Sequence, residues 1–284
     1  MTEPVRRSIE TAAGVMSCLE WGKTGAHTLL FAHANGFNAL TYRTLLAPLA
    51  TDIHIVACDL RGHGRSTLPA LPGLVNGWTV FRDDLLALAG SISDGPVVFA
   101  GHSLGATASF MAAAISPERV RALVLLEPVF LAPIPTDGPG GSNSLADMAA
   151  QRRNVFPSVA AALDYYRSRG IFARWPEQVL RDYLADGLTN HGEGVLRLAC
   201  APAWEAEIFR EVPFGVATMA DKVKCPVTVL RGTVASTAAD DQIASIPGAG
   251  AEANVITIEG ANHFLPLEQP ERPRNELLRA AKLL

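Results

Sequence analysis

Residues 97–111 read VVFAGHSLGATASFM, and this stretch decides the fold. An apolar run that is typical of a buried strand leads through Gly-His-Ser-Leu-Gly into small residues that are typical of a helix. A strand joined to a helix by Gly-x-Ser-x-Gly is the layout of a nucleophile elbow, a strained turn that presents a serine hydroxyl at the end of a sheet. Glycine is needed on both sides because side chains there would collide with the neighbouring strand and helix. Ser103 is therefore the predicted nucleophile.

Similar apolar runs recur along the chain, and each ends in polar residues or glycine. They cover residues 28–32, 53–58, 120–126, 226–230 and 255–258. Helical patterns separate the runs, which indicates a parallel sheet covered on both faces. Because ligands bind beyond the carboxyl ends of the strands in such sheets, the polar residues that follow the runs are the candidate site.

Four motifs stand in a fixed order: HANGF at residues 33–37, DLRGHGRS at 59–66, GHSLG at 101–105 and GANHF at 260–264. With these motifs the chain resembles the α/β-hydrolase superfamily along nearly its whole length. The resemblance implies an α/β-hydrolase fold, in which a mostly parallel eight-stranded sheet is flanked by helices. It also implies a nucleophile, an acid and a histidine in the order Ser, Asp or Glu, His.

An insertion interrupts the strand pattern. Residues 131–215 show helical periodicity, whereas residues 1–130 and 216–284 carry the strand signals. The superfamily commonly carries a helical cap at this point, after the sixth strand. We therefore expect a core domain of residues 1–130 and 216–284, with residues 131–215 forming a helical cap, or lid, over the serine.

His263 is the predicted base. It follows the last strand signal and precedes the C-terminal helix, where the superfamily places its histidine. A neutral imidazole can take the proton of Ser103, because its pKa lies near the working pH.

The acid departs from the family pattern, because Ala235 stands where most relatives carry an aspartate after the seventh strand. Glu127 is the first candidate to replace it. It ends an apolar run, where a charge needs a partner, and some members of the superfamily carry their acid after the sixth strand. Asp240 and Asp241 are the alternative acids.

Two backbone N–H groups are needed to stabilise the negative charge that develops on the substrate oxygen. Leu104, the residue after the nucleophile, is expected to supply one. Alignment with the family's His-Gly-x-Pro loop suggests Phe37 for the other, with Asn35 as the alternative. The expected substrate-pocket side chains are His102, Phe130, Trp175 and Trp204.

The composition of the chain limits the partners and cofactors that we expect. The chain has 284 residues, 49% of them hydrophobic, and a formal net charge of -4 with no long basic run, which argues against nucleic acid as a partner. Its four cysteines form no Cys-x-x-Cys pair, and no motif implies a metal or cofactor. No signal peptide or membrane-length apolar run is visible, so we expect a cytoplasmic protein without a membrane partner.

Together these features predict a serine hydrolase that cleaves a small-molecule ester or lactone through an acyl-enzyme intermediate. A carbon-carbon bond hydrolase would use the same three residues. A non-catalytic ligand-binding member of the fold is the other alternative, although such a protein need not retain both Ser103 and His263.

Overall fold

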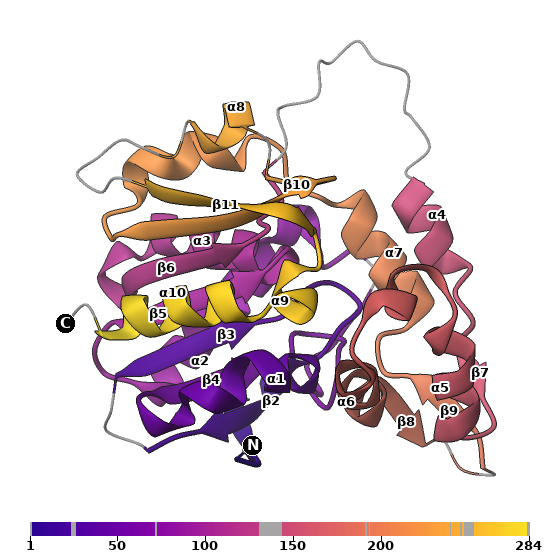
Figure 1. The fold of residues 1–284 in the computed structure, drawn as a ribbon. Helices are drawn as coiled ribbons and strands as arrows, with labels where there is room; N and C mark the ends of the chain where they lie inside the picture. The colour runs from indigo at the N-terminus through magenta and orange to yellow at the C-terminus, as the bar shows by residue number, and fades with distance from the viewer. Residues whose placement is uncertain are drawn as a thin grey trace.

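The computed structural model describes residues 2–23, 27–71, 73–130, 144–190, 192, 194–238, 240–244, 246 and 253–282. Its centre is an eight-stranded sheet of order β1-β2-β4-β3-β5-β6-β10-β11 (Figure 1). The strands are β1 Val5–Thr11, β2 Gly14–Trp21, β3 Thr28–Ala32, β4 His54–Cys58, β5 Val97–His102, β6 Val120–Leu126, β10 Val227–Val234 and β11 Ala253–Asn262. β2 pairs antiparallel with β1 and β4, and the other neighbours pair parallel. The expected fold class is confirmed.

Helices cover both faces of this sheet. α2 (Thr79–Ile92) and α3 (Leu104–Ile115) belong to one apolar core, and α1 (Arg43–Leu46) and α10 (Glu271–Lys282) to the core on the opposite face. The central strands are buried on both sides, which explains why their sequences are continuous apolar runs. The remaining helices outside the insertion are short: α8 Asp240–Ile243, α9 Leu265–Glu268, and the 3-10 helices η1 Ala39–Tyr42, η2 Ala47–Thr51, η3 Asn76–Trp78, η4 Pro117–Arg119 and η6 Val216–Lys222.

The insertion between β6 and β10 lies beside the sheet, at the side where β10 ends (Figure 1). Its helices are α4 Ser144–Ala150, α5 Val159–Arg167, η5 Gly170–Arg174, α6 Glu177–Gly187 and α7 Pro202–Arg210. A small antiparallel sheet of order β7-β9-β8 accompanies them, built from Val155–Phe156, Leu196–Leu198 and Leu188–Asn190. The sequence analysis did not predict this sheet, because strands of two or three residues are too short to show a periodic pattern. Residues 131–143 of the predicted cap lie outside the described residues.

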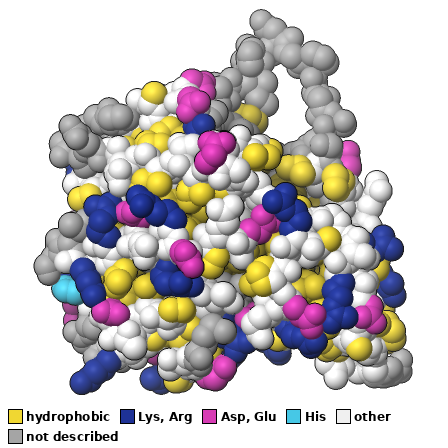
Figure 2. Space-filling model, in the orientation of Figure 1, with side chains coloured by type: hydrophobic (Ala, Val, Ile, Leu, Met, Phe, Trp, Pro, Cys, Tyr) yellow, Lys and Arg dark blue, Asp and Glu magenta, His cyan; other side chains and the backbone are white. Residues whose placement is uncertain are grey.

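Charged side chains of both signs are interspersed on the face shown in Figure 2. No helix in the described part of the chain is both long and apolar enough to cross a membrane. Cys18, Cys58, Cys200 and Cys225 are all buried and free. Burial raises the pKa of each thiol, so these cysteines remain protonated and unreactive.

Candidate active site

Ser103 alone forms the turn between β5 and α3. Its φ of 53° and ψ of -115° are costly for a residue with a side chain. The flanking glycines make the turn possible: a Cβ on Gly101 would lie 2.4 Å from the carbonyl carbon of Gly105, and a Cβ on Gly105 would lie 2.2 Å from the carbonyl oxygen of Ala32. The N–H of Ser103 donates to the carbonyl of Leu126 at 3.0 Å, which ties the turn to β6. The turn thus has the geometry of a nucleophile elbow with Ser103 at its apex.

Glu127 and His263 meet at the carboxyl edge of the sheet. Oε2 of Glu127, a wholly buried side chain at the end of β6, lies 3.4 Å from Nδ1 of His263. The end of β10 and the loop after it hold the carboxylate with the N–H groups of Gly232 at 2.5 Å and Thr237 at 3.0 Å, and with the Ser236 hydroxyl at 2.9 Å. Burial opposes ionisation, but the bonds from His263, Gly232 and Thr237 outweigh it and lower the pKa of Glu127. Glu127 is therefore a carboxylate at neutral pH.

The alternative acids lie elsewhere. Asp240 begins α8, has a 91% exposed side chain and pairs with Arg231. Asp241 follows it, and its carboxylate accepts a hydrogen bond from Gln242 at 2.9 Å. Of the three carboxylates considered from the sequence, Glu127 is the one that the structure brings to His263.

Thr237 was missed by the sequence analysis. Its hydroxyl oxygen lies 3.1 Å from Nδ1 of His263 and 3.2 Å from the carbonyl oxygen of Glu127. A proton on Nδ1 of His263 therefore has two acceptors, the Glu127 carboxylate and the Thr237 hydroxyl. That proton leaves Nε2 of His263 unprotonated, which is the tautomer that a general base needs.

His102 is wholly buried, with both ring nitrogens occupied. Nε2 lies 2.7 Å from the carbonyl oxygen of His263, and Nδ1 lies 2.7 Å from the Tyr42 hydroxyl. A carbonyl only accepts, so Nε2 carries the proton and Nδ1 accepts from Tyr42. Burial lowers the pKa of His102 well below its ordinary value, so the ring is neutral. His102 thus supports the backbone of His263, which differs from its expected place in the pocket wall.

Ser103 and His263, both within the described residues, form no direct hydrogen bond with each other. Hydrogen bonds between a nucleophile and its base often form only in the substrate complex.

The predicted oxyanion donors differ in their surroundings. Leu104 is the first residue of α3, where helices leave N–H groups without intrahelical partners. The N–H of Phe37, in contrast, donates to the carbonyl of Ala34 at 3.2 Å within a tight turn. The choice of Phe37 is therefore corrected, because its N–H is already used. The N–H of Gly36 is used as well, because it donates to Nε2 of His63 at 3.0 Å, so the alternative, Asn35, becomes the candidate donor from this loop.

A sequence model of the alpha/beta hydrolase family matches residues 29–275, most of the chain. The chain belongs to the alpha/beta hydrolase family. It is similar to 2-(acetamidomethylene)succinate hydrolase of Mesorhizobium japonicum, with 26% identity over 243 residues that cover 86% of this chain and 84% of that protein. It is also similar to Esterase Rv0045c of Mycobacterium tuberculosis, with 30% identity over 162 residues that cover 54% and 49% of the two chains. The crystal structure of E-2-(acetamidomethylene)succinate hydrolase shares the fold, with a TM-score of 0.79, 22% identity and coverage of 97% of this chain and 98% of that one.

A cavity of about 320 Å³ opens beside His263 of this hydrolase. Its walls come from the insertion, the end of β10 with the residue after it, the end of β11, and the region around α9: Gly170, Ile171, Arg174, Val234, Ala235, Asn262, His263, Phe264 and Glu268. Within the described residues, no group of three or more His, Cys, Asp or Glu side chains is arranged to hold a metal ion.

The expected pocket aromatics have other surroundings. Phe130 packs in the core on Phe110, with 5.0 Å between ring centroids. Trp204 donates from its indole nitrogen to the carbonyl of Arg61 at 3.1 Å, so it fastens α7 to the core. Trp175 lies between Phe37 and Phe264, with ring-centroid distances of 5.2 and 6.1 Å. Phe130 and Trp204 are therefore packing residues, because other residues of the protein surround their side chains and leave little surface for a substrate.

Proposed function

We propose that this hydrolase cleaves a carboxylic ester or lactone through an acyl-enzyme intermediate. Ser103 attacks the carbonyl carbon, while His263 takes the hydroxyl proton and returns it to the leaving alcohol. Water, activated by the same histidine, then attacks the acyl-enzyme and releases the acid. Glu127 holds His263 in the required tautomer and stabilises the imidazolium that forms. The contact between the buried Glu127 carboxylate and Nδ1 of His263 is the observation that carries this proposal.

The backbone N–H groups of Leu104 and Asn35 stabilise the oxyanion of the tetrahedral intermediate in this mechanism. Each such donor contributes about 3 kcal/mol to lowering the barrier. The pairing of the Phe37 N–H with Ala34 supports Asn35 as the second donor.

The insertion acts as a cap in this proposal, and the substrate is a small molecule. The contacts of Trp175 with Phe37 and Phe264 support this role, because they connect the insertion to both sides of the site. The cavity beside His263 lies at the small end of the usual range for ligand pockets, roughly 300 to 1,000 Å³. Buried, free thiols suit a reducing compartment, which supports a cytoplasmic location.

Covalent labelling with a fluorophosphonate tests the nucleophile. We expect wild type to be labelled and to hydrolyse a short p-nitrophenyl ester, and Ser103→Ala to lose labelling and several orders of magnitude in turnover. Ser91→Ala, on the exposed side of α2, is the control that keeps both. Labelling that persists in Ser103→Ala contradicts the proposed nucleophile. A wild type that is neither labelled nor active on any ester favours a non-catalytic ligand-binding protein.

The second candidate is hydrolysis of a carbon-carbon or amide-type bond with the same three residues. It is favoured by the likeness over 86% of the chain to a protein named 2-(acetamidomethylene)succinate hydrolase. Turnover of esters, lactones, N-acyl enamines and diketones by one enzyme preparation separates the candidates. A kcat/KM for an N-acyl or diketone substrate that exceeds every ester value would replace the ester assignment.

A further inference from the structure

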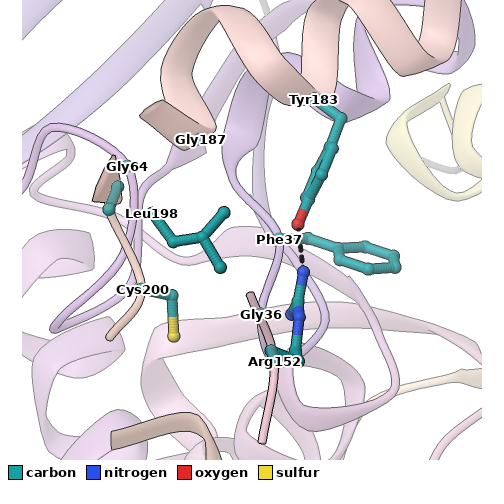
Figure 3. A pocket seen from close by; sticks show the side chains of 9 residues that line it. Gly36, Phe37, Gly64, Arg152, Tyr183, Gly187, Leu198 and Cys200 are labelled. Carbon is teal, nitrogen blue, oxygen red and sulfur yellow. Dashed lines mark hydrogen bonds between the residues drawn. The ribbon is translucent and has the colours of Figure 1, made fainter. Parts of the chain in front are cut away.

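Arg152 and Glu205 form a buried ion pair inside the insertion. Nη1 of Arg152 lies 2.5 Å from Oε2 of Glu205, and the two side chains are only 18% and 7% exposed. Nη2 of Arg152 also donates to the hydroxyls of Tyr183 at 2.6 Å and Tyr166 at 3.1 Å. Figure 3 shows the guanidinium reaching toward the Tyr183 hydroxyl beside Gly36 and Phe37. Through these contacts with Tyr166, Tyr183 and Glu205, Arg152 joins helices α5, α6 and α7 of the insertion at one point.

That point lies against residues 35–37, which we call the oxyanion loop. A Cβ on Gly36 would lie 2.6 Å from Oε1 of Glu205 and 3.2 Å from Nη1 of Arg152, so both charged groups touch the glycine. The backbone carbonyl of Glu205 accepts a hydrogen bond from Nδ2 of Asn35 at 3.1 Å. The space left at this contact is about 10 Å³, the room of a single water molecule. The loop cannot move toward the insertion without displacing the ion pair.

His63 holds the loop from the core side. Its Nδ1 lies 2.9 Å from the carbonyl of Arg61, so Nδ1 carries the proton and Nε2 accepts the N–H of Gly36. Burial lowers the pKa of His63 to about 4, and the positive charge of Arg152 acts in the same direction, against the backbone contacts. The oxyanion loop is thus held between a neutral histidine of the core and an ion pair of the insertion.

We propose that Arg152 and Glu205 are positioning residues that set the oxyanion loop for catalysis. This inference rests on the proposed function. A buried ion pair adds little net stability, because desolvation of the two charges offsets their attraction. It does fix geometry, since the carboxylate must stay where the guanidinium and the two tyrosine hydroxyls hold it. The insertion then does more than cover the site: it determines where the Asn35 N–H points.

Glu205→Gln tests the inference, because it keeps the shape of the side chain and removes its charge. We expect kcat to fall about 100-fold, as for a displacement of about 1 Å at the reacting centre, with KM changed less than about threefold. The affinity for a trifluoromethyl ketone inhibitor, whose adduct with Ser103 carries an oxyanion, should fall in parallel with kcat.

Asp182→Asn is the matched control. Its carboxylate is only 5% exposed and pairs with Arg43 at 2.7 and 3.0 Å, which joins α6 of the insertion to α1 of the core. This variant also breaks a buried ion pair between insertion and core, but its carboxylate binds Arg43 and Gln178 and not the oxyanion loop. We expect it to lose stability and to retain kcat and inhibitor affinity.

Equal losses of kcat in Glu205→Gln and Asp182→Asn would overturn the inference, because the ion pair would then act only through stability. Normal kcat in a folded Glu205→Gln enzyme would overturn it as well. If Glu205→Gln does not fold, Asn35→Ala removes the side-chain bond to the Glu205 carbonyl while keeping the backbone N–H, and it must show the same parallel loss. A wild type that neither hydrolyses esters nor binds the ketone instead overturns the proposed function, and this inference with it.

Discussion

The ring of His102 lies against that of His263, with 4.9 Å between centroids, and donates to the backbone carbonyl of His263. His102→Phe keeps an aromatic ring and removes this donor. The Tyr42 hydroxyl then loses the acceptor of its proton, while still accepting from the Ala34 N–H, and the His263 carbonyl loses the His102 donor, at about 1–3 kcal/mol each. We expect a free energy of unfolding lower by about 2–4 kcal/mol and a kcat lower by about tenfold. Tyr42→Phe is the control, since it spares the bond to His263. Equal kcat losses in both variants would show that the contact with His263 has no special role.

Glu127→Gln should lower kcat by up to about four orders of magnitude, because an amide favours the wrong tautomer of His263. Asp240→Asn and Asp241→Asn should each cost less than about tenfold, or about 1.4 kcal/mol in barrier height. Turnover of a short p-nitrophenyl ester by the purified variants, with folding checked by urea unfolding, compares them. Near-normal kcat in Glu127→Gln with collapse in either aspartate variant would transfer the role of acid to α8.

Thr237→Val removes the hydroxyl that lies between His263 and Glu127 and keeps a β-branched side chain. We expect kcat to fall about tenfold with KM little changed, since only the orientation of the imidazole is affected. Thr237→Ser restores the hydroxyl and should restore most of the activity. If the serine variant is as impaired as the valine variant, the methyl packing of Thr237 matters and its hydroxyl does not.

His63 should make stability depend on pH between about 4 and 6.5. Its pKa is lowered in the folded protein from 6.5 to about 4, so the unfolded chain binds more protons in this range. The contribution of His63 is complete above pH 6.5 and is lost as the pH falls toward 4, by about 3 kcal/mol in all. This loss is absent in His63→Gln. The free energy of unfolding of wild type minus that of the variant should therefore become smaller as the pH falls from 7 to 4.5. Urea unfolding at both pH values measures it, and parallel pH dependences would refute the assignment.

Much of the sheet could be predicted because its strands are buried on both faces and therefore read as unbroken apolar runs. The runs at 28–32 and 120–126 coincide with β3 and β6. The same logic pointed to Glu127, since a charge that ends such a run needs a buried partner. Local sequence was informative here because burial alone determined which residue types fit.

The parts that sequence reasoning missed depend on distant pairing. Arg152 and Glu205 are 53 positions apart, and each fits an ordinary exposed helix position when taken alone. The N–H of Phe37 is excluded as a donor only by a turn whose hydrogen bond is invisible in the sequence. Trp204 resembles a pocket residue until its indole N–H is seen on Arg61. Composition and periodicity describe how buried a residue is, but not which partner it meets.

The end of β10 and the loop that follows it provide the Gly232, Ser236 and Thr237 donors for Glu127. Ala235, where the resemblance to the superfamily places an aspartate, lines the same cavity as His263. Glu127 therefore depends on the strand beside its own, so substitutions of Ser236 or Thr237 should change catalysis through the carboxylate without altering any of the three proposed catalytic side chains.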